Sequence, residues 1–170
     1  LGSSLYSAQL AAQLGLPFAF ASHFAPRMLM QAIQIYRQTF RPSQQLAAPY
    51  VAIGVPLVAA PSDEEATYLA SSTHQRVLGI LTGRRGQLPP PVENFLSSLD
   101  SGAQAAIADF LAAAVIGGPD TVRAGLQQLA ALTQANELVL VSDVYDAESR
   151  RRSLDIAAAA ARELNAAVAQ

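Results

Sequence analysis

The 170-residue chain contains no cysteine, and it holds only two histidines, His23 and His74. Without cysteine, disulfides, zinc–thiolate sites and a cysteine nucleophile are all excluded. The two histidines lie far apart in the sequence, which argues against a histidine-rich metal site. No metal is therefore expected in this protein.

Charge is scarce as well, because Asp, Glu, Lys and Arg together make up 14% of the chain and the formal net charge is −2. A nucleic-acid-binding protein needs a basic face, and the densest basic run, Arg150–Arg152, lies inside a helical pattern. No apolar stretch reaches the roughly 18 residues that a membrane-spanning helix requires. Hydrophobic residues still make up 51%, enough for one domain with a substantial core. We expect a soluble, cytoplasmic protein that binds neither nucleic acid nor membrane.

Short apolar runs alternate with longer helical patterns along the chain. This alternation predicts parallel βαβ units, as in a doubly wound sheet or in part of a barrel. Pro56 lies inside the longest apolar run and predicts a bulge or a break there. The strand-like runs are 18–21, 50–60 and 137–142; the helical patterns are 7–14, 26–40, 62–81, 102–114, 119–134 and one that begins after Asp146.

Several local signals mark the ends of these elements. Ser62 and Glu65 predict a capping box, in which each side chain satisfies a backbone amide near the helix start. Asp146 is predicted to be the N-cap of the last helix. Residues 83–93 include three consecutive prolines and predict a stiff, extended surface segment. Its arginines, Arg84 and Arg85, fit a solvated loop tip better than contact with a phosphate-bearing ligand.

The serines near the N-terminus form the first candidate site. Ser3, Ser4 and Ser7 lie where a loop passes into a helix. Such a junction offers free backbone N–H groups and the positive end of the helix dipole, which suit a phosphate. The alternative is that these serines only cap the helix.

Four segments together carry a resemblance to a known family. They are Gly-Ser-Ser-Leu-Tyr-Ser with the following residues (2–17), Phe-Ala-Phe-Ala-Ser-His-Phe (18–24), Ile-Gly-Gly-Pro-Asp-Thr-Val (116–122), and Asn-Glu-Leu-Val-Leu-Val-Ser (136–142) followed by Asp146, Arg150 and Ser153. In this order they resemble the C-terminal half of the bacterial luciferase-like, flavin-dependent monooxygenases.

The resemblance implies an α/β fold, the C-terminal half of a (β/α)8 TIM-type barrel with parallel strands and outer helices. A complete barrel takes about 250 residues and eight strands, whereas three strands are apparent here, or four with a stub at Leu1. We therefore expect a single partial domain over residues 1–170, without the N-terminal strands and with a surface insertion at about 83–115. The missing N-terminal half of the barrel and a homo-oligomer are the expected protein partners.

The resemblance also implies a function: oxidation of a small organic substrate with O2 and reduced FMN, which a separate reductase supplies. A deazaflavin is the alternative cofactor. By position, Ser4 and Ser7 would hold the FMN phosphate, with the backbone of Ser3 and Tyr6 in reach. His23 ends a strand on the side where barrels place the active site, so it would contact flavin or substrate or act as an acid or base. The alternative for His23 is a loop histidine packed on Phe24.

Two other functions fit the sequence. One is a non-catalytic relative that only binds flavin. The other is a truncated half-barrel that serves as an interaction or oligomerisation module, because such a half exposes strand edges and apolar faces. His74 lies in the middle of a helical pattern and is expected to be a surface or packing residue. The sequence does not specify the substrate, because substrate contacts lie on variable strand-end loops.

Overall fold

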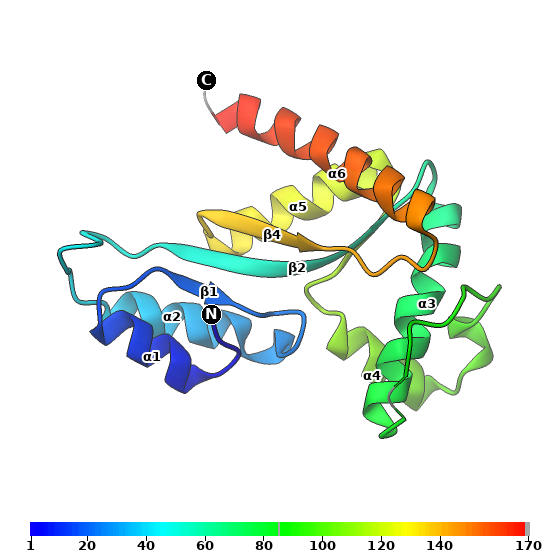
Figure 1. Ribbon diagram of the computed structural model, residues 1–170, viewed down its shortest axis with the longest axis horizontal. Coiled ribbons are helices and arrows are strands. Elements are labelled where there is room, and N and C mark those ends of the chain that lie inside the picture. Colours follow the sequence, from blue (N-terminus) through cyan, green and yellow to red (C-terminus); the bar gives the residue numbers. More distant parts are fainter. Residues whose placement is uncertain (85, 169–170) are drawn as a thin grey trace.

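A computed structural model describes residues 1–84 and 86–168 as a parallel sheet flanked by helices. β2 runs through the middle of the molecule, with α1 and α2 beside β1, and α5 and α6 beside β4 (Figure 1). α3 and α4 lie together near one end of the sheet. In chain order the elements are α1 (Leu5–Gln13), β1 (Phe18–Phe20), α2 (Leu29–Thr39), β2 (Val51–Ala59), α3 (Asp63–Leu81), α4 (Ser101–Phe110), β3 (Val115–Gly117), α5 (Pro119–Thr133), β4 (Glu137–Val141) and α6 (Ala147–Val168), with short 3-10 helices at Pro26–Met28 and Leu96–Ser98.

β2 organises the sheet, because each of the other strands pairs with it in parallel. Ala52 faces Ala19 of β1 and also Glu137 of β4, so β1 and β4 lie on opposite sides of β2. The N-terminal stub adds a further parallel bridge, in which the Gly2 N–H donates to the Ala19 carbonyl at 3.0 Å. The predicted parallel arrangement is thus confirmed.

The bulge or break predicted at Pro56 is wrong, because β2 continues through it from Val51 to Ala59. Pro56 is paired with Val141 at the last position of the β4 ladder, and the β3 ladder begins at the next residue, Leu57. A proline, which has no N–H to donate, is tolerated where the strand changes partners.

The two faces of the sheet differ in side-chain size. Phe18, Phe20, Ile53 and Val55 point to one face and form the core with the helices. On that side Tyr36 of α2 is fully buried, and its hydroxyl donates to the Leu16 carbonyl at 2.8 Å and accepts from the Tyr50 N–H at 3.1 Å. The strand register places smaller apolar residues on the opposite face, together with Glu137 at the start of β4: Ala19, Ala52, Gly54, Pro56, Val139 and Val141.

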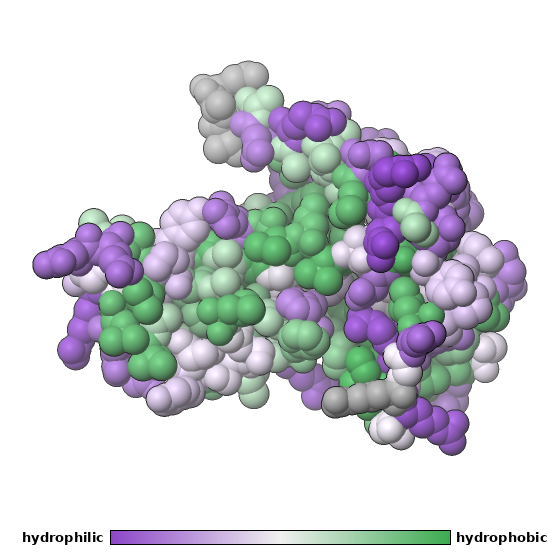
Figure 2. Space-filling view, in the orientation of Figure 1, coloured by the Kyte–Doolittle hydropathy of each residue, from purple (hydrophilic) through white to green (hydrophobic). Residues whose placement is uncertain are grey.

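This second face is only partly covered. Val139 keeps 50% of its surface exposed although it lies in a strand of the sheet. In space-filling view, apolar surface also gathers in the hollow between the sheet and the C-terminal half of α6 (Figure 2), the helix whose Ala157 and Ala160 pack on the first face with Ile53 and Val55. Exposed apolar surface of this kind is typical of a face that packs against further protein or a ligand.

Three local predictions need correction. The helix predicted over 102–114 ends at Phe110, and Val115–Gly117, where no strand was predicted, forms β3 through its pairing with β2. The helix predicted to begin at Ser7 begins at Leu5, with Ser4 as its N-cap. Only half of the predicted capping box is present: the Ser62 hydroxyl accepts from the Glu65 N–H at 3.2 Å, whereas the Glu65 carboxylate pairs with Arg152 at 2.9 Å.

The proline-rich segment lies on α3 without helix or strand, as predicted for 83–93; Arg85 lies outside the described residues. Side chains of α3 hold it: the Ser71 hydroxyl accepts from the Val92 N–H at 2.7 Å, and the Gln75 amide donates to the Pro90 carbonyl at 2.8 Å. Asp146 caps α6 as predicted, since it accepts from the Ser149 N–H at 2.7 Å. None of the helices in the described ranges has the length and hydropathy needed to cross a membrane.

Candidate functional site

The candidate site lies at the carboxyl ends of the parallel strands, where open α/β sheets and barrels bind their ligands. The Gly2 carbonyl accepts from the Ala21 N–H at 2.8 Å, just beyond the end of β1. This bond brings the segment Ser3–Ser7 and the loop that carries His23 to neighbouring strand ends. The serine segment and His23, separate in the sequence, therefore belong to one edge of the sheet.

The serine segment forms a compact cap on α1. The Ser4 hydroxyl accepts from the Ser7 N–H at 3.2 Å, and the Ser7 hydroxyl donates to the Ser4 carbonyl at 2.7 Å and accepts from the Ser4 N–H at 3.3 Å. Gly2 permits this turn, because a Cβ there would lie 2.2 Å from Ser7 Oγ. The first amides of a helix have no partner within it, so the N–H groups of Leu5 and Tyr6 point out of an exposed cap.

The cap engages the two serine hydroxyls that were predicted to bind an anion at this helix start. The Ser4 and Ser7 hydroxyls form hydrogen bonds with each other and with the backbone. The alternative prediction, that these two serines cap the helix, is therefore confirmed. Capping does not exclude anion binding, because the dipole and the outward N–H groups remain. Ser3 is exposed, and the Tyr6 side chain keeps 73% of its surface free.

His23 lies in the loop after β1 and folds over β2. The neighbouring Ser22 is fully buried, and its hydroxyl donates to the Gly54 carbonyl, which fixes the loop on the strand. The imidazole sits directly over Gly54, where a Cβ would lie 2.5 Å from His23 Nδ1. The ring packs on Phe24 with centroids 4.2 Å apart, as the loop-packing alternative predicts.

The imidazole is nevertheless not a fully satisfied loop histidine. Nδ1 is buried and has no hydrogen-bond partner within the described part of the chain. Burial lowers the pKa of His23 below its usual 6.5, while the Asp143 carboxylate raises it and Arg76 lowers it further. The lowered pKa favours the neutral ring near pH 7, and Nδ1 is the ring nitrogen that the described residues leave without a hydrogen-bond partner.

Asp143 and Arg76 form an ion pair close to His23, and neither was predicted as a site residue. Asp143 lies two residues after the end of β4, and its carboxylate accepts from Arg76 Nη2 of α3. The Thr73 hydroxyl donates to the Asp143 carbonyl at 3.1 Å and ties the strand end to α3. Arg76 Nε and the hydroxyl of Ser142 are buried and, like His23 Nδ1, lack a hydrogen-bond partner among residues 1–84 and 86–168.

The position of Asp143 after a strand was a usable signal, because strand-end acids often line sites in parallel sheets. Arg76 offered no such signal. Its partner is 67 residues away in sequence, and it lies in the middle of a long helix. His74, two residues earlier, is 92% buried, since its exposed fraction is 8%, and burial lowers its pKa; it is a packing residue, as expected.

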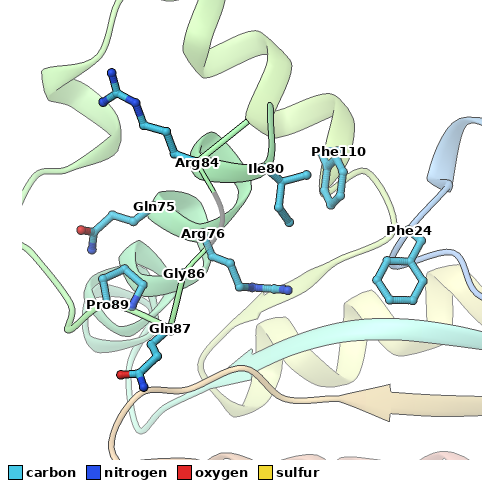
Figure 3. A pocket seen from close by; sticks show the side chains of 9 residues that line it. All are labelled: Phe24, Gln75, Arg76, Ile80, Arg84, Gly86, Gln87, Pro89 and Phe110. Carbon is cyan, nitrogen blue, oxygen red and sulfur yellow. The ribbon is translucent and has the colours of Figure 1, made fainter. Parts of the chain in front are cut away.

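A groove of about 620 Å³ opens beside this ion pair, between α3, residues 84 and 86–89, α4 and the loop after β1. Arg76 extends toward Phe24, with Ile80 and Phe110 beside its path, whereas Arg84 points the other way (Figure 3). The groove is lined by Phe24, Gln75, Arg76, Ile80, Arg84, Gly86, Gln87, Pro89 and Phe110. A volume in the range of about 300–1,000 Å³ is typical of small-molecule sites.

The Gly117–Gly118 turn belongs to the scaffold of the site. Asp63 at the start of α3 accepts from the Gly118 N–H at 2.6 Å and from the Thr121 hydroxyl at 3.1 Å. The Gly118 N–H lowers the pKa of the Asp63 carboxyl, with the Thr121 hydroxyl acting in the same direction. A Cβ at Gly117 would lie 2.4 Å from Thr121 Cγ2, so this glycine permits the tight start of α5.

Comparison with known proteins gives a consistent family. The sequence profile described as luciferase-like monooxygenase matches residues 1–135. A luciferase-like monooxygenase from Escherichia coli K12 is 43% identical over 164 residues, which is 96% of this chain and 49% of the relative. The solved structure of apo-MsnO8 superposes with a TM-score of 0.78 at 31% identity and covers 95% of this chain and 49% of that one. The chain thus spans about half the length of the relatives it matches.

More distant structures show the same fold alone. A riboflavin lyase, RcaE, solved with modified FMN and riboflavin, gives a TM-score of 0.56 at 18% identity, over 96% of this chain and 42% of that one. A coenzyme F420-dependent tetrahydromethanopterin reductase from Methanopyrus kandleri gives 0.55 at 12% identity, over 94% of this chain and 48% of that one. With apo-MsnO8, these barrel enzymes confirm the predicted fold class, half of a (β/α)8 barrel with parallel strands and outer helices.

Proposed function

The chain belongs to the luciferase-like monooxygenase family, and on that premise we propose that it forms half of a flavin-dependent monooxygenase that oxidises an organic substrate with O2 and reduced FMN. One observation carries the proposal beyond family membership. The exposed N-terminus of α1 and the imidazole of His23 lie at adjacent strand ends, joined by the bond from Ala21 N–H to Gly2 O. A phosphate site next to a neutral acid–base group suits a phosphate-bearing redox cofactor.

The N-terminus of α1 fits the FMN phosphate. The N–H groups of Leu5 and Tyr6 provide donors, and the helix dipole adds partial positive charge. The Ser4 and Ser7 hydroxyls hold these amides in place through the cap. The exposed backbone of Ser3 borders the same site, and the Tyr6 side chain is free to cover the ribityl chain.

The small-residue face of the sheet fits the flat ring system of a flavin. Ala19, Ala52 and Gly54 leave the strands without bulky side chains beside His23. The bound flavin would supply the reaction with O2, as cofactors do for chemistry that amino acids lack. The chain's own residues would position the reactants, with Phe24 and Phe110 as apolar contacts, and the His23 imidazole would hold the proton.

The uncovered sheet face favours a partner. Val139 is half exposed, and β4 carries no strand on the side away from β2 among the pairs described. We infer that the other strands of a (β/α)8 barrel cover this face in the working enzyme, because isolated strand edges and apolar faces associate. A deazaflavin would meet the same phosphate and ring contacts, so FMN is proposed first and a deazaflavin second.

The test of the proposed function measures reduced-flavin oxidation. The chain, together with the complementary barrel half of a close relative, would be incubated with photoreduced FMN under O2, and hydrogen peroxide would be quantified. Slower FMN reoxidation than in free solution, dependent on His23, supports the proposal. If FMN were reoxidised in the presence of the protein at the same rate as in free solution, the proposal would be contradicted.

A further inference from the structure

We propose that the groove of Figure 3 binds the organic substrate, and that Arg76 selects a flat apolar molecule that carries an anionic oxygen group, such as a carboxylate or a phenolate. This inference rests on the proposed function, because it assigns the second ligand of the same strand-end site. Phe24 connects the proposed flavin site with the groove, because it packs on His23 and also lines the groove.

The lining of the groove combines apolar contact with positive charge. Phe24, Ile80 and Phe110 provide two aromatic rings and a branched aliphatic side chain on one side. The charged residues that line it, among those described, are Arg76 and Arg84, and no carboxylate lines it. A binding site of this composition favours an apolar body with one negative group.

Arg76 is the residue aimed at such a group. Asp143 holds one end of the guanidinium through Nη2, while the side chain extends toward Phe24 and is about one-third exposed, at 33%. An arginine has five N–H donors, and the ion pair with Asp143 engages Arg76 through Nη2 alone. The ion pair therefore fixes the guanidinium and leaves donors for an oxygen of the ligand.

Asp143 does not cancel this preference. Asp143 is not among the residues that line the groove; it lines a separate small cavity together with Thr73. A ligand in the groove therefore contacts Arg76, which lines it, and lies farther from the Asp143 carboxylate, which does not. Coulomb attraction falls with distance, so an anion on the open side is favoured.

Arg84 provides a matched control. Its backbone N–H donates to the Gly79 carbonyl at 2.7 Å, and Gly79 allows this approach because a Cβ there would lie 2.5 Å from the Arg84 carbonyl oxygen. The exposed Arg84 side chain points away from Phe24 and Phe110 (Figure 3). Arg84→Met removes the same charge as Arg76→Met from the same groove, but from the end without aromatic contact.

Two fluorescent probes separate charge from apolar contact: 1-anilinonaphthalene-8-sulfonate and N-phenyl-1-naphthylamine, which has the same rings without the sulfonate. Arg76→Met should weaken binding of the sulfonate probe about tenfold to a hundredfold, the range for a hydrogen bond to a charged group. It should change binding of the neutral probe by less than about twofold. Arg84→Met should change both by less than about threefold, and Phe110→Ala should weaken both. Equal loss of both probes in Arg76→Met, or no effect of Phe110→Ala, would overturn the proposal.

Folding and flavin binding are measured in parallel. Arg76→Met/Asp143→Asn removes both charges of the pair and should bind the two probes as Arg76→Met does, whereas Arg76→Lys should recover part of the sulfonate affinity. FMN affinity should be the same in Arg76→Met and the parent chain; an equal loss of FMN would assign Arg76 to the flavin and contradict the inference. If the chain bound no FMN, the proposed function would fail while the probe results still decided the role of Arg76.

Discussion

Gly54→Ala offers a sharp test of how His23 is held. The new Cβ would lie 2.5 Å from His23 Nδ1, whereas ordinary contacts begin at 3.4 Å, so the imidazole has to withdraw by about 0.9 Å. The loop cannot yield freely, because the Ser22 hydroxyl anchors it to the Gly54 carbonyl and the Ala21 N–H anchors it to Gly2.

The expected cost is that of overpacking a well-ordered site, about 1–3 kcal/mol of unfolding free energy. Part of this is offset by about 0.5 kcal/mol or more, since alanine loses less backbone entropy than glycine on folding. Urea denaturation followed by circular dichroism measures the difference. Gly86→Ala is the control, because a Cβ at Gly86 meets nothing within 4 Å, and it should be neutral or slightly stabilising.

A double-mutant cycle identifies the cause. If the clash is with the imidazole, Gly54→Ala should cost little or nothing in a His23→Ala background, and the coupling energy should approach the single-mutant loss. A cost that is the same in both backgrounds would refute the placement of His23 over Gly54, and with it the argument that glycine positions the histidine.

Three further outcomes follow from the structure. Tyr36→Phe should lower the unfolding free energy by about 1–3 kcal/mol in urea denaturation, since it leaves two partly buried backbone groups, the Leu16 carbonyl and the Tyr50 N–H, unpaired, whereas Tyr6→Phe at the exposed ring should change it by less than about 0.5 kcal/mol; equal effects would contradict this. Burial lowers the pKa of His74 below 6.5, so the stability due to its neutral form is present above pH 6.5 and lost as the pH falls toward the folded-state pKa; His74→Gln should flatten the pH dependence of unfolding in this range, and an unchanged slope would count against it. Because the Asp143 carboxylate raises the pKa of His23, Asp143→Asn should lower that pKa further in an NMR titration, and a rise would show that another group dominates.

Much of the fold could be predicted because its signals are local. β2 is nearly all apolar and buried, as expected for a parallel strand covered on both faces. Pro119 at the first turn of α5 and Asp146 before α6 marked helix starts correctly. β3 was missed because its three residues are too few for periodicity, and only pairing with β2 defines them as a strand.

The site was predictable only in part. The serine cap and His23 stand at element ends, where sequence position relates directly to the edge of a parallel sheet. The ion pair of Arg76 and Asp143 could not be predicted, because it joins a helix interior to a strand end 67 residues away. The same holds for Gly54, which became informative only when His23 was seen to lie over it.

The most direct test of the central claim, that the N-terminus of α1 recognises the FMN phosphate, is native mass spectrometry of the chain with FMN or riboflavin at equal concentration. Riboflavin has the same ring and ribityl chain without the phosphate. The account predicts one FMN per chain, much lower occupancy by riboflavin, and a smaller difference between the two in Ser4→Ala, which loses the helix cap. Equal occupancy by FMN and riboflavin, or no bound flavin in either sample, would contradict it.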